Sequence, residues 1–287
     1  KIKLFNENHG LDVTAGHEIN NSYGESISMY GNKFPASFSS ERAFGMMDQY
    51  LGGTNPINFG ISSNIITPNR WISYFGRVNY SFLDRYLFTA TFRADASSKF
   101  PSANRWGYFP AAAVGWRVSD ESFMKHINWI SNLKLRASYG EAGNDAIDAN
   151  KWRLQWLSGT TRYSINELLQ SAYNPDNTMP NPNVKWESTI TRNIGIDYSL
   201  FNSRLFGAID FYKNSTKDVL WLVPLDPSTT GFTGIYKNVG STSNKGIEFS
   251  AGSDIVRKKD FVLTANFNIN FNKGSINELA PGINPFY

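Results

Sequence analysis

Side chains that commonly perform catalysis or hold metal ions are few in this chain and widely spaced. The sequence contains three histidines, His9, His17 and His126, and none lies at a metal-ligand spacing from another histidine or from a cluster of carboxylates. It has no cysteine, no glycine loop of the kind that cradles phosphate, and no nucleophile at a recognisable spacing from a base. We therefore expect no catalytic site, no metal site and no cofactor.

Two acidic residues and one charged pair are further candidates for chemistry. Asp145 and Asp148 have the residue type of a glycosidase pair or of calcium ligands, but acids near a loop glycine are more often simply exposed to solvent. Arg93 and Asp95 lie two residues apart, so in a strand both point to the same face. We interpret them as an ion pair, with contact to a substrate as the alternative.

Aromatic side chains in the long polar segments are the candidates for binding a ligand. Flat aromatic faces bind amphipathic groups such as sugar rings or peptide side chains well. The candidates are Trp152, Trp156, Tyr163, Tyr173, Trp221, Phe232 and Tyr236. The alternative is structural, because such rings also pack loop against loop or form the aromatic girdle of a membrane barrel.

Most of the chain alternates between apolar and polar residues with a period of two, which is typical of strands with one apolar and one polar face. In the run from Phe261 to Phe271, the apolar residues alternate with Thr264 and a series of asparagines. Asparagine is a poor strand former, and a packed sandwich core would exclude it. The polar face is therefore predicted to be the hydrated inner wall of a wide barrel, with the apolar face toward lipid.

The alternation predicts nine long strands. Their ranges are Leu11 to Asn21, Ile72 to Phe82, Arg85 to Ala96, Gly107 to Val118, Leu133 to Glu141, Trp186 to Leu200, Arg204 to Asn214, Ser241 to Asp254 and Phe261 to Asn272. Strands that cross a membrane need about 9–11 residues, whereas strands of globular proteins have about 5–6. Tight connections such as Leu83-Asp84 alternate with long ones such as Ser22 to Trp71 and Ala142 to Lys185, as in membrane barrels. The long connections are rich in turn residues, and we expect no hydrophobic core from them.

Composition excludes several other classes of protein. Although 41% of the residues are hydrophobic, no run approaches the roughly 18–20 apolar residues of a membrane helix. The 28 basic and 24 acidic residues are scattered, unlike the basic stripe of a nucleic-acid-binding protein. Without cysteine there is no disulfide framework, which suits a bacterial envelope protein.

One segment, from Gly76 to Met124, closely resembles the SusC/RagA class of TonB-dependent outer-membrane transporters of Bacteroidetes. It reads GRVNYSFLDRYLFTATFRADASSKFPSANRWGYFPAAAVGWRVSDESFM. The resemblance continues through LKLRASYGEAGN, NPNVKWESTITRNIGIDY, RLFGAIDFYKNSTKDVL and NVGSTSNKGIE, and it extends from Tyr74 to the end of the sequence.

This resemblance implies an all-β fold, an antiparallel transmembrane β-barrel of about 22 strands to which residues 1–287 contribute one part. It also implies that the signal peptide, an N-terminal domain, the TonB box, the plug and the remaining strands lie outside this sequence. Proteins of this class lie in the bacterial outer membrane and use energy from TonB to import oligosaccharides, or in some members oligopeptides, together with a SusD-like surface lipoprotein. The resemblance thus implies a transporter that is not an enzyme and takes no cofactor.

The residues that match the family pattern most densely form one hairpin and its outer loop, and we expect a structural role for them. They are Arg93, Asp95, Ser98, Phe100, Asn104, Arg105, Trp106, Gly107, Phe109 and Pro110. Pro110 lacks a backbone donor and predicts an irregular ladder. Trp186, where the chain re-enters a strand from an outer loop, is expected at the height of the membrane interface.

Two other classes of protein stay open as alternatives. A self-contained passive porin or adhesin barrel would need neither plug nor energy coupling, but single-chain bacterial barrels have an even number of strands. A soluble β-sandwich that binds glycans would bury the apolar faces in a core. The length of the predicted strands and the sorting of their connections argue against the sandwich.

Overall fold

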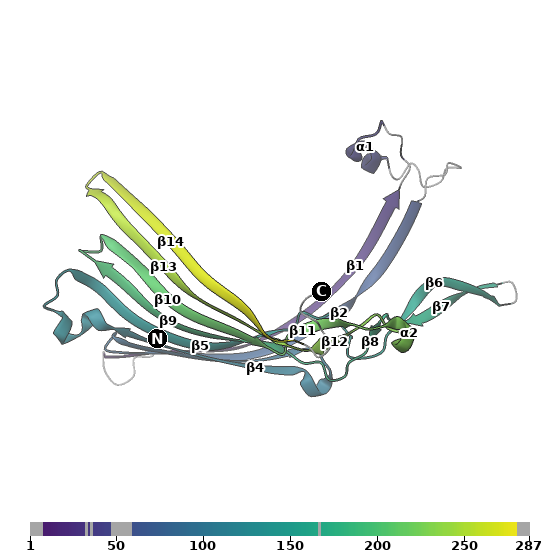
Figure 1. The fold of residues 1–287 in the computed structure, drawn as a ribbon, viewed down its shortest axis with the longest axis horizontal. Coiled ribbons are helices and arrows are strands. Elements are labelled where there is room, and N and C mark those ends of the chain that lie inside the picture. Colours follow the sequence, from purple (N-terminus) through teal and green to yellow (C-terminus); the bar gives the residue numbers. More distant parts are fainter. Residues whose placement is uncertain (1–7, 32–33, 35–36, 47–58, 166–167, 280–287) are drawn as a thin grey trace. The chain divides into compact units, whose positions relative to one another are not determined.

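The main sheet has nine strands in the order β1-β2-β3-β4-β5-β9-β10-β13-β14 (Figure 1). The computed structural model describes residues 8–31, 34, 37–46, 59–165 and 168–279. The strands are β1 His9–Gly31, β2 Phe59–Phe82, β3 Tyr86–Ser97, β4 Trp106–Arg117, β5 Ile130–Asn144, β9 Glu187–Leu200, β10 Leu205–Lys217, β13 Ser241–Lys258 and β14 Phe261–Glu278. The nine predicted strands are thus confirmed. Consecutive strands of this set of nine pair with each other, while the shorter strands of the long connections lie outside the main sheet.

Cross-strand register separates the two faces of this sheet as the alternation predicts. One row of directly paired residues is polar or small and contains Arg136, Gly195, Asp210, Glu248 and Asn270. The next row, shifted by one residue, is apolar and contains Leu135, Ile196, Ile209, Phe249 and Ile269. Directly paired residues share a face, so the sheet has a polar face, called the inner face below, and an apolar outer face.

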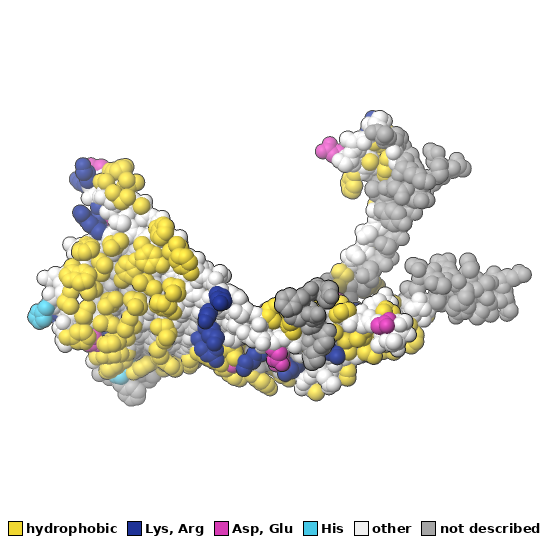
Figure 2. All heavy atoms as spheres, in the orientation of Figure 1, with side chains coloured by type: hydrophobic (Ala, Val, Ile, Leu, Met, Phe, Trp, Pro, Cys, Tyr) yellow, Lys and Arg dark blue, Asp and Glu magenta, His cyan; other side chains and the backbone are white. Residues whose placement is uncertain are grey.

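Large apolar side chains on the outer face stay exposed. Ile194 and Phe271 are each 64% exposed, and Phe267 is 55% exposed. Figure 2 shows the hydrophobic side chains gathered into one broad patch over the strands that lead to the tight turns. A soluble sandwich would bury this face, whereas a sheet that faces lipid leaves it uncovered by protein.

The tight connections lie at one end of the sheet and the long ones at the other (Figure 1). Leu83 and Asp84, between β2 and β3, both have a φ of 52°. A left-handed backbone at both central positions is that of a type I′ turn, whose twist matches the twist of the flanking strands. Phe201, Asn202 and Ser203, between β9 and β10, also have positive φ values. The predicted sorting of connections is therefore present.

The link from β4 to β5 contains two short 3-10 helices, η3 Val118–Asp120 and η4 Ser122–Met124. Between them, Glu121 accepts hydrogen bonds from the Tyr86 hydroxyl at 2.7 Å and from Trp116 Nε1 at 3.0 Å, and it pairs with Arg85 at 3.3 Å. These donors lower the pKa of Glu121, the Tyr86 hydroxyl most of all. The carboxylate thus ties the start of β3 and the end of β4 to this link.

The long connections contain secondary structure of their own. The additional elements are η2 Ser102–Asn104, β6 Trp156–Ile165, β7 Leu168–Pro175, β8 Thr178–Met179, β11 Leu220–Pro224, α2 Pro227–Thr230 and β12 Gly234–Asn238. β6 and β7 form a hairpin, and β11, β12 and β8 form a small sheet in which β12 and β8 are parallel. Our expectation of turns without a core is wrong for these connections, as the packing around Phe100 shows below.

The chain divides into two compact units, and the second comprises residues 21–69. Within it, β1 and β2 continue as strands, so the long connection expected from Ser22 to Trp71 is wrong at both its ends. Backbone pairing needs no apolar alternation, which explains why the pattern missed these extensions. The unit also contains helix α1 Ser40–Gly45, capped by the Ser39 hydroxyl. No helix in the described residues is long and apolar enough to cross a membrane.

Candidate functional site

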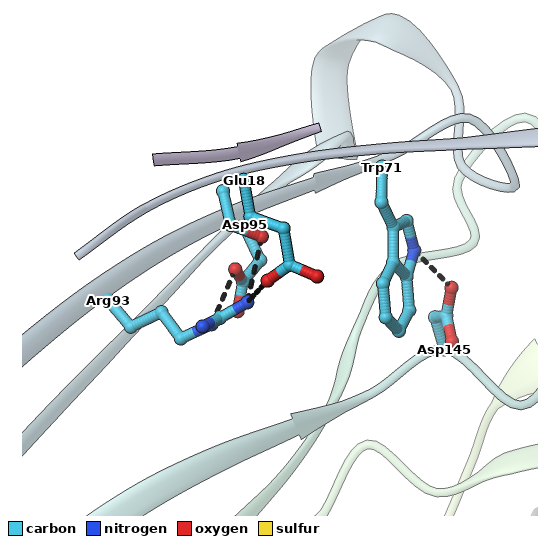
Figure 3. A network of polar contacts seen from close by, with 6 residues as sticks. Glu18, Trp71, Arg93, Asp95 and Asp145 are labelled. Atoms are coloured by element: carbon cyan, nitrogen blue, oxygen red, sulfur yellow. Dashed lines mark hydrogen bonds and ion pairs between the residues drawn. The ribbon is translucent and has the colours of Figure 1, made fainter. Parts of the chain in front are cut away.

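A network of charged and hydroxyl groups lies on the inner face where β1, β2 and β3 approach the long connections (Figure 3). Arg93 Nε donates to both oxygens of Asp95, at 2.7 and 2.9 Å. Its Nη2 donates to the Ser73 hydroxyl at 2.9 Å and to Glu18 Oε2 at 3.4 Å. Arg93 and Asp95 therefore form the ion pair expected from their spacing, and the pair links three neighbouring strands.

Asp145 anchors the connection after β5 to this part of the sheet. Its Oδ2 accepts hydrogen bonds from Trp71 Nε1 at 2.9 Å (Figure 3) and from the Ser97 hydroxyl at 2.8 Å. Lys99 Nζ donates to its backbone oxygen at 3.1 Å and lies 3.7 Å from its carboxylate. Asp145 is only 9% exposed, so the expectation of a solvated loop acid is wrong for it, whereas Asp148 is exposed as expected.

A small hydrophobic core lies among the long connections. Phe100 and Val184 are fully buried, and Ile147 is 4% exposed. Phe100 comes from the connection after β3, whereas Ile147 and Val184 come from opposite ends of the connection between β5 and β9, so no sequence periodicity relates the three. Trp186 packs against this core with its ring centroid 5.1 Å from that of Phe100 and 5.5 Å from that of Phe109. Trp186 thus packs among the long connections, and its position at the height of the membrane interface stays a prediction.

The family-pattern residues between Ser97 and Trp106 join these connections through backbone groups. The Ser98 hydroxyl accepts a hydrogen bond from the Arg70 amide at 2.9 Å. Asn104 Nδ2 donates to the backbone oxygens of Asn183, at 3.1 Å, and of the next residue. The Arg105 carbonyl accepts from Trp186 Nε1 at 3.0 Å. The bond of Ser98 ties the connection after β3 to β2, and the bonds of Asn104 and Arg105 hold it against the segment that leads into β9.

The remaining family-pattern residues shape β4. A Cβ on Gly107 would lie 2.5 Å from the Phe109 ring, so glycine leaves space for that ring. Pro110 pairs with Phe92 in a regular register, and the pairing of β4 with β5 begins only at the following residue. The irregularity expected at Pro110 thus takes the form of an unpaired edge toward β5. Trp106 is 41% exposed, and its ring is stacked on a tyrosine of β2.

Two of the candidate aromatic residues belong to the core of the long connections. Trp152 and Tyr236 pack against the cluster of Phe100, Ile147 and Val184. Burial raises the pKa of Tyr236, and so does the nearby Asp148 carboxylate, which accepts a hydrogen bond from its hydroxyl at 3.5 Å. Both rings are thus largely occupied by protein contacts.

The other candidate aromatic residues divide by exposure. Trp156, Tyr173 and Trp221 are 60%, 67% and 55% exposed, respectively, and Phe232 is half-buried. Trp156 pairs with Pro175 in the β6–β7 hairpin, and Tyr173 lies two residues before that proline, so both rings share one face of the hairpin. Tyr163 belongs to β6, but its side chain lies outside the described part of the structure.

Farther along the inner face, four charged side chains form a chain across β5, β9 and β10. Arg136 donates to Asp197 at 3.0 Å and to Asp210 at 2.6 Å, and Lys134 lies 3.8 Å from Asp197. A Cβ on Gly195 would lie 2.7 Å from Arg136 Cζ, so this glycine lets the guanidinium cross β9. We did not single out these residues from sequence, because only the register shows that they are neighbours.

The inner face is thus a wall of hydroxyl, amide and paired charged groups, which can bind a polar solute through many weak hydrogen bonds. Among the described residues, no group of three or more His, Asp or Glu side chains could hold a metal ion.

Comparison with known proteins gives the class of protein. The family described as TonB dependent receptor-like, beta-barrel matches residues 3–285. The chain belongs to this family and lies in the outer membrane, in agreement with the expected antiparallel barrel fold. Over 226 residues it is 39% identical to the TonB-dependent receptor SusC of Bacteroides thetaiotaomicron, a match that covers 75% of this chain and 22% of the relative.

Two further relatives extend the match over nearly the whole chain. The TonB-dependent receptor P39 of Formosa agariphila is 34% identical, over 97% of this chain and 25% of the relative. The structure of the RagAB peptide transporter matches with a TM-score of 0.78 and 27% identity, over 97% of this chain and 29% of the matched one. The chain therefore spans about a quarter of the length of these relatives.

Proposed function

We propose that the protein to which this chain belongs is an active importer of large nutrients across the outer membrane. The observation that carries this proposal is the agreement between the family match and the two faces of the sheet. An apolar outer face suits lipid, and a continuous polar inner face suits a hydrated path wide enough for a solute. A passive porin would share both faces, so energy coupling is what the experiment must test.

TonB and a SusD-like surface lipoprotein are the proposed partners. The similarity to receptors named for their dependence on TonB supports TonB as the source of energy. The similarity to SusC and to the RagAB transporter supports a lipoprotein partner at the surface. The long connections offer it a firm platform, because Phe100 and Val184 pack them into a core.

The proposed substrates are oligosaccharides, or alternatively oligopeptides. The resemblance of the sequence to the SusC/RagA class supports the former, and similarity to the RagAB peptide transporter supports the latter. Both kinds of polymer have many hydrogen-bonding groups that the inner wall can bind. The exposed rings of Trp156, Tyr173 and Trp221 lie in the long connections, where aromatic faces can bind sugar rings or peptide side chains.

Uptake by intact cells tests this proposal. Cells that carry the full-length protein are supplied with a set of fluorescent oligosaccharides in one arm and with fluorescent oligopeptides in another. We expect uptake of one class, and we expect it to stop when TonB is deleted. Uptake that survives the loss of TonB would show a passive pore instead.

The exposed aromatic residues are tested in the same assay. Replacing Trp156 and Tyr173 together with alanine should lower uptake at limiting substrate. Phe123→Ala is the matched control, because this ring is also exposed, at 60%, but belongs to the link between β4 and β5. Equal uptake by both variants would remove these rings from the binding site.

A further inference from the structure

Four basic residues form one continuous row across the outer face. Arg192 of β9 pairs directly with Lys213 of β10, Lys213 pairs with Lys245 of β13, and Lys245 pairs with Lys273 of β14. All four side chains are exposed. In Figure 2, Lys and Arg side chains border the hydrophobic patch on the side away from the tight turns.

The rows on either side show where this basic row lies relative to the membrane. The next row of outer-face residues toward the tight turns, two positions along each strand, is apolar and contains Ile194, Phe211, Ile247 and Phe271. The next row of outer-face residues toward the long connections consists mostly of serines and contains Ile190, Ser215, Ser243 and Ser275. The apolar band of the outer face thus ends at the basic row, on the side of the long connections. At this height a membrane has its lipid headgroups.

The basic row has no carboxylate partner within the described part of the chain. None of its four members takes part in an ion pair there, and Arg192 instead lies over the Tyr139 ring at 5.6 Å. The nearby acid Glu141 is bound to the Tyr139 hydroxyl. Like charges directly opposite each other in a sheet repel and destabilise it. Four such neighbours in register therefore indicate an anionic partner from outside the chain.

A hollow of about 930 Å³ adjoins the basic row. Its lining includes all four basic residues together with apolar side chains of the adjoining row and of β4 and β5. The apolar members are Ala112, Val114, Ala137, Ile194, Phe211, Ile247 and Phe271. A phosphate at the basic row would thus have an apolar surface directly beneath it. Such a surface fits an acyl chain and offers nothing to a free inorganic anion.

We propose that this row and hollow bind a phosphate-bearing lipid of the outer leaflet, with phosphate groups on Arg192, Lys213, Lys245 and Lys273 and acyl chains in the hollow. The long connections are the outer end of barrels of this family, so the site faces the outer leaflet. A headgroup with two phosphates matches the row best, because each phosphate can bridge two neighbouring cations and relieve their repulsion.

Native mass spectrometry of the full-length protein tests the proposal. The protein is purified in mild detergent and titrated with lipid A, an acylated glycolipid with two phosphates. We expect a bound lipid A, and we expect the double variant Lys213→Gln/Lys245→Gln to bind it at least about tenfold more weakly, since each basic group near an anionic surface contributes measurably. Lys258→Gln is the matched control, because this lysine lies on β13 at its tight-turn end and should leave binding unchanged.

Two further arms separate the possible sources of the anion. Dephosphorylated lipid A should bind weakly to the wild-type protein, and inorganic phosphate should not displace lipid A. Displacement by inorganic phosphate, equal binding of the dephosphorylated lipid, or unchanged binding by the double variant would each overturn the proposal. The charge-conserving variant Lys213→Arg/Lys245→Arg should retain the lipid, which distinguishes loss of charge from a misfolded barrel.

Discussion

Asp145→Ala should loosen the long connections from the sheet without unfolding the strands. In the wild-type protein, Asp145 Oδ2 accepts one bond from the Ser97 hydroxyl, at 2.8 Å, and one from Trp71 Nε1, at 2.9 Å. Ser97 is fully buried, whereas Trp71 is 38% exposed. Alanine would remove the acceptor for both donors and leave at least the buried serine hydroxyl proton without an acceptor.

The magnitude follows from these two bonds. A buried donor left unpaired costs about 1–3 kcal/mol, and a bond whose donor can still reach water contributes about 1 kcal/mol. Asp145→Ala should therefore make local opening easier by about 2–4 kcal/mol, which is about 30-fold to 1000-fold in the opening equilibrium. Because both donors bind the same oxygen, Asp145→Asn can keep both bonds through its amide oxygen and should cost much less.

Hydrogen exchange of the full-length protein in detergent measures this opening. Peptides that cover residues 97–105 and 144–150 should exchange faster in the alanine variant, while peptides from β9 and β10 should not change. Asp148→Ala is the matched control, because that carboxylate is exposed and has only a 3.5 Å contact with Tyr236. Unchanged exchange in the alanine variant, or equal effects of alanine and asparagine at position 145, would refute the assigned anchor role.

Three further predictions concern the strands and their ends. Phe267→Arg should hinder barrel insertion by about 2–4 kcal/mol if this residue lies near mid-bilayer, whereas Asn268→Arg on the inner face should be tolerated. Folding yield in lipid vesicles measures both variants. Equal yields would contradict the assignment of an outer, lipid-facing side and an inner side to β14. Gly143→Ala would press a Cβ against the Phe109 ring and should destabilise this region by about 1–3 kcal/mol, seen as faster local exchange; unchanged exchange would contradict that close packing. Hydrogen bonds from Tyr86 and other donors lower the pKa of Glu121 in the folded protein, so its contribution to stability is present above the ordinary carboxyl pKa and is lost as pH falls through the lowered value. Glu121→Gln should therefore remove this part of the acid dependence of thermal unfolding. An unchanged acid dependence in the variant would refute the role of the carboxylate.

The sequence alone was sufficient to determine the strands and their faces. Alternation with a period of two is a local property, so the run from Phe261 to Phe271 shows both the strand and its lipid-facing side without knowledge of its partners. The same locality predicted the ion pair of Arg93 and Asp95, which are two residues apart on one strand. The ends of β1 and β2 were missed because pairing there continues without an apolar pattern.

Tertiary structure decided everything that depends on which strands and connections meet. Phe100, Ile147 and Val184 are far apart in the sequence, and they form a core only because the connection after β3 meets both ends of the connection between β5 and β9. The sequence predicted a solvated acid at Asp145, but in the folded chain this carboxylate accepts hydrogen bonds from Ser97 and Trp71. The basic row likewise depends on register, because a slip of one residue in any strand would turn its lysine or arginine to the inner face. Composition and period specify what one strand presents on each face, whereas a site also requires the contacts between segments that are distant in the chain.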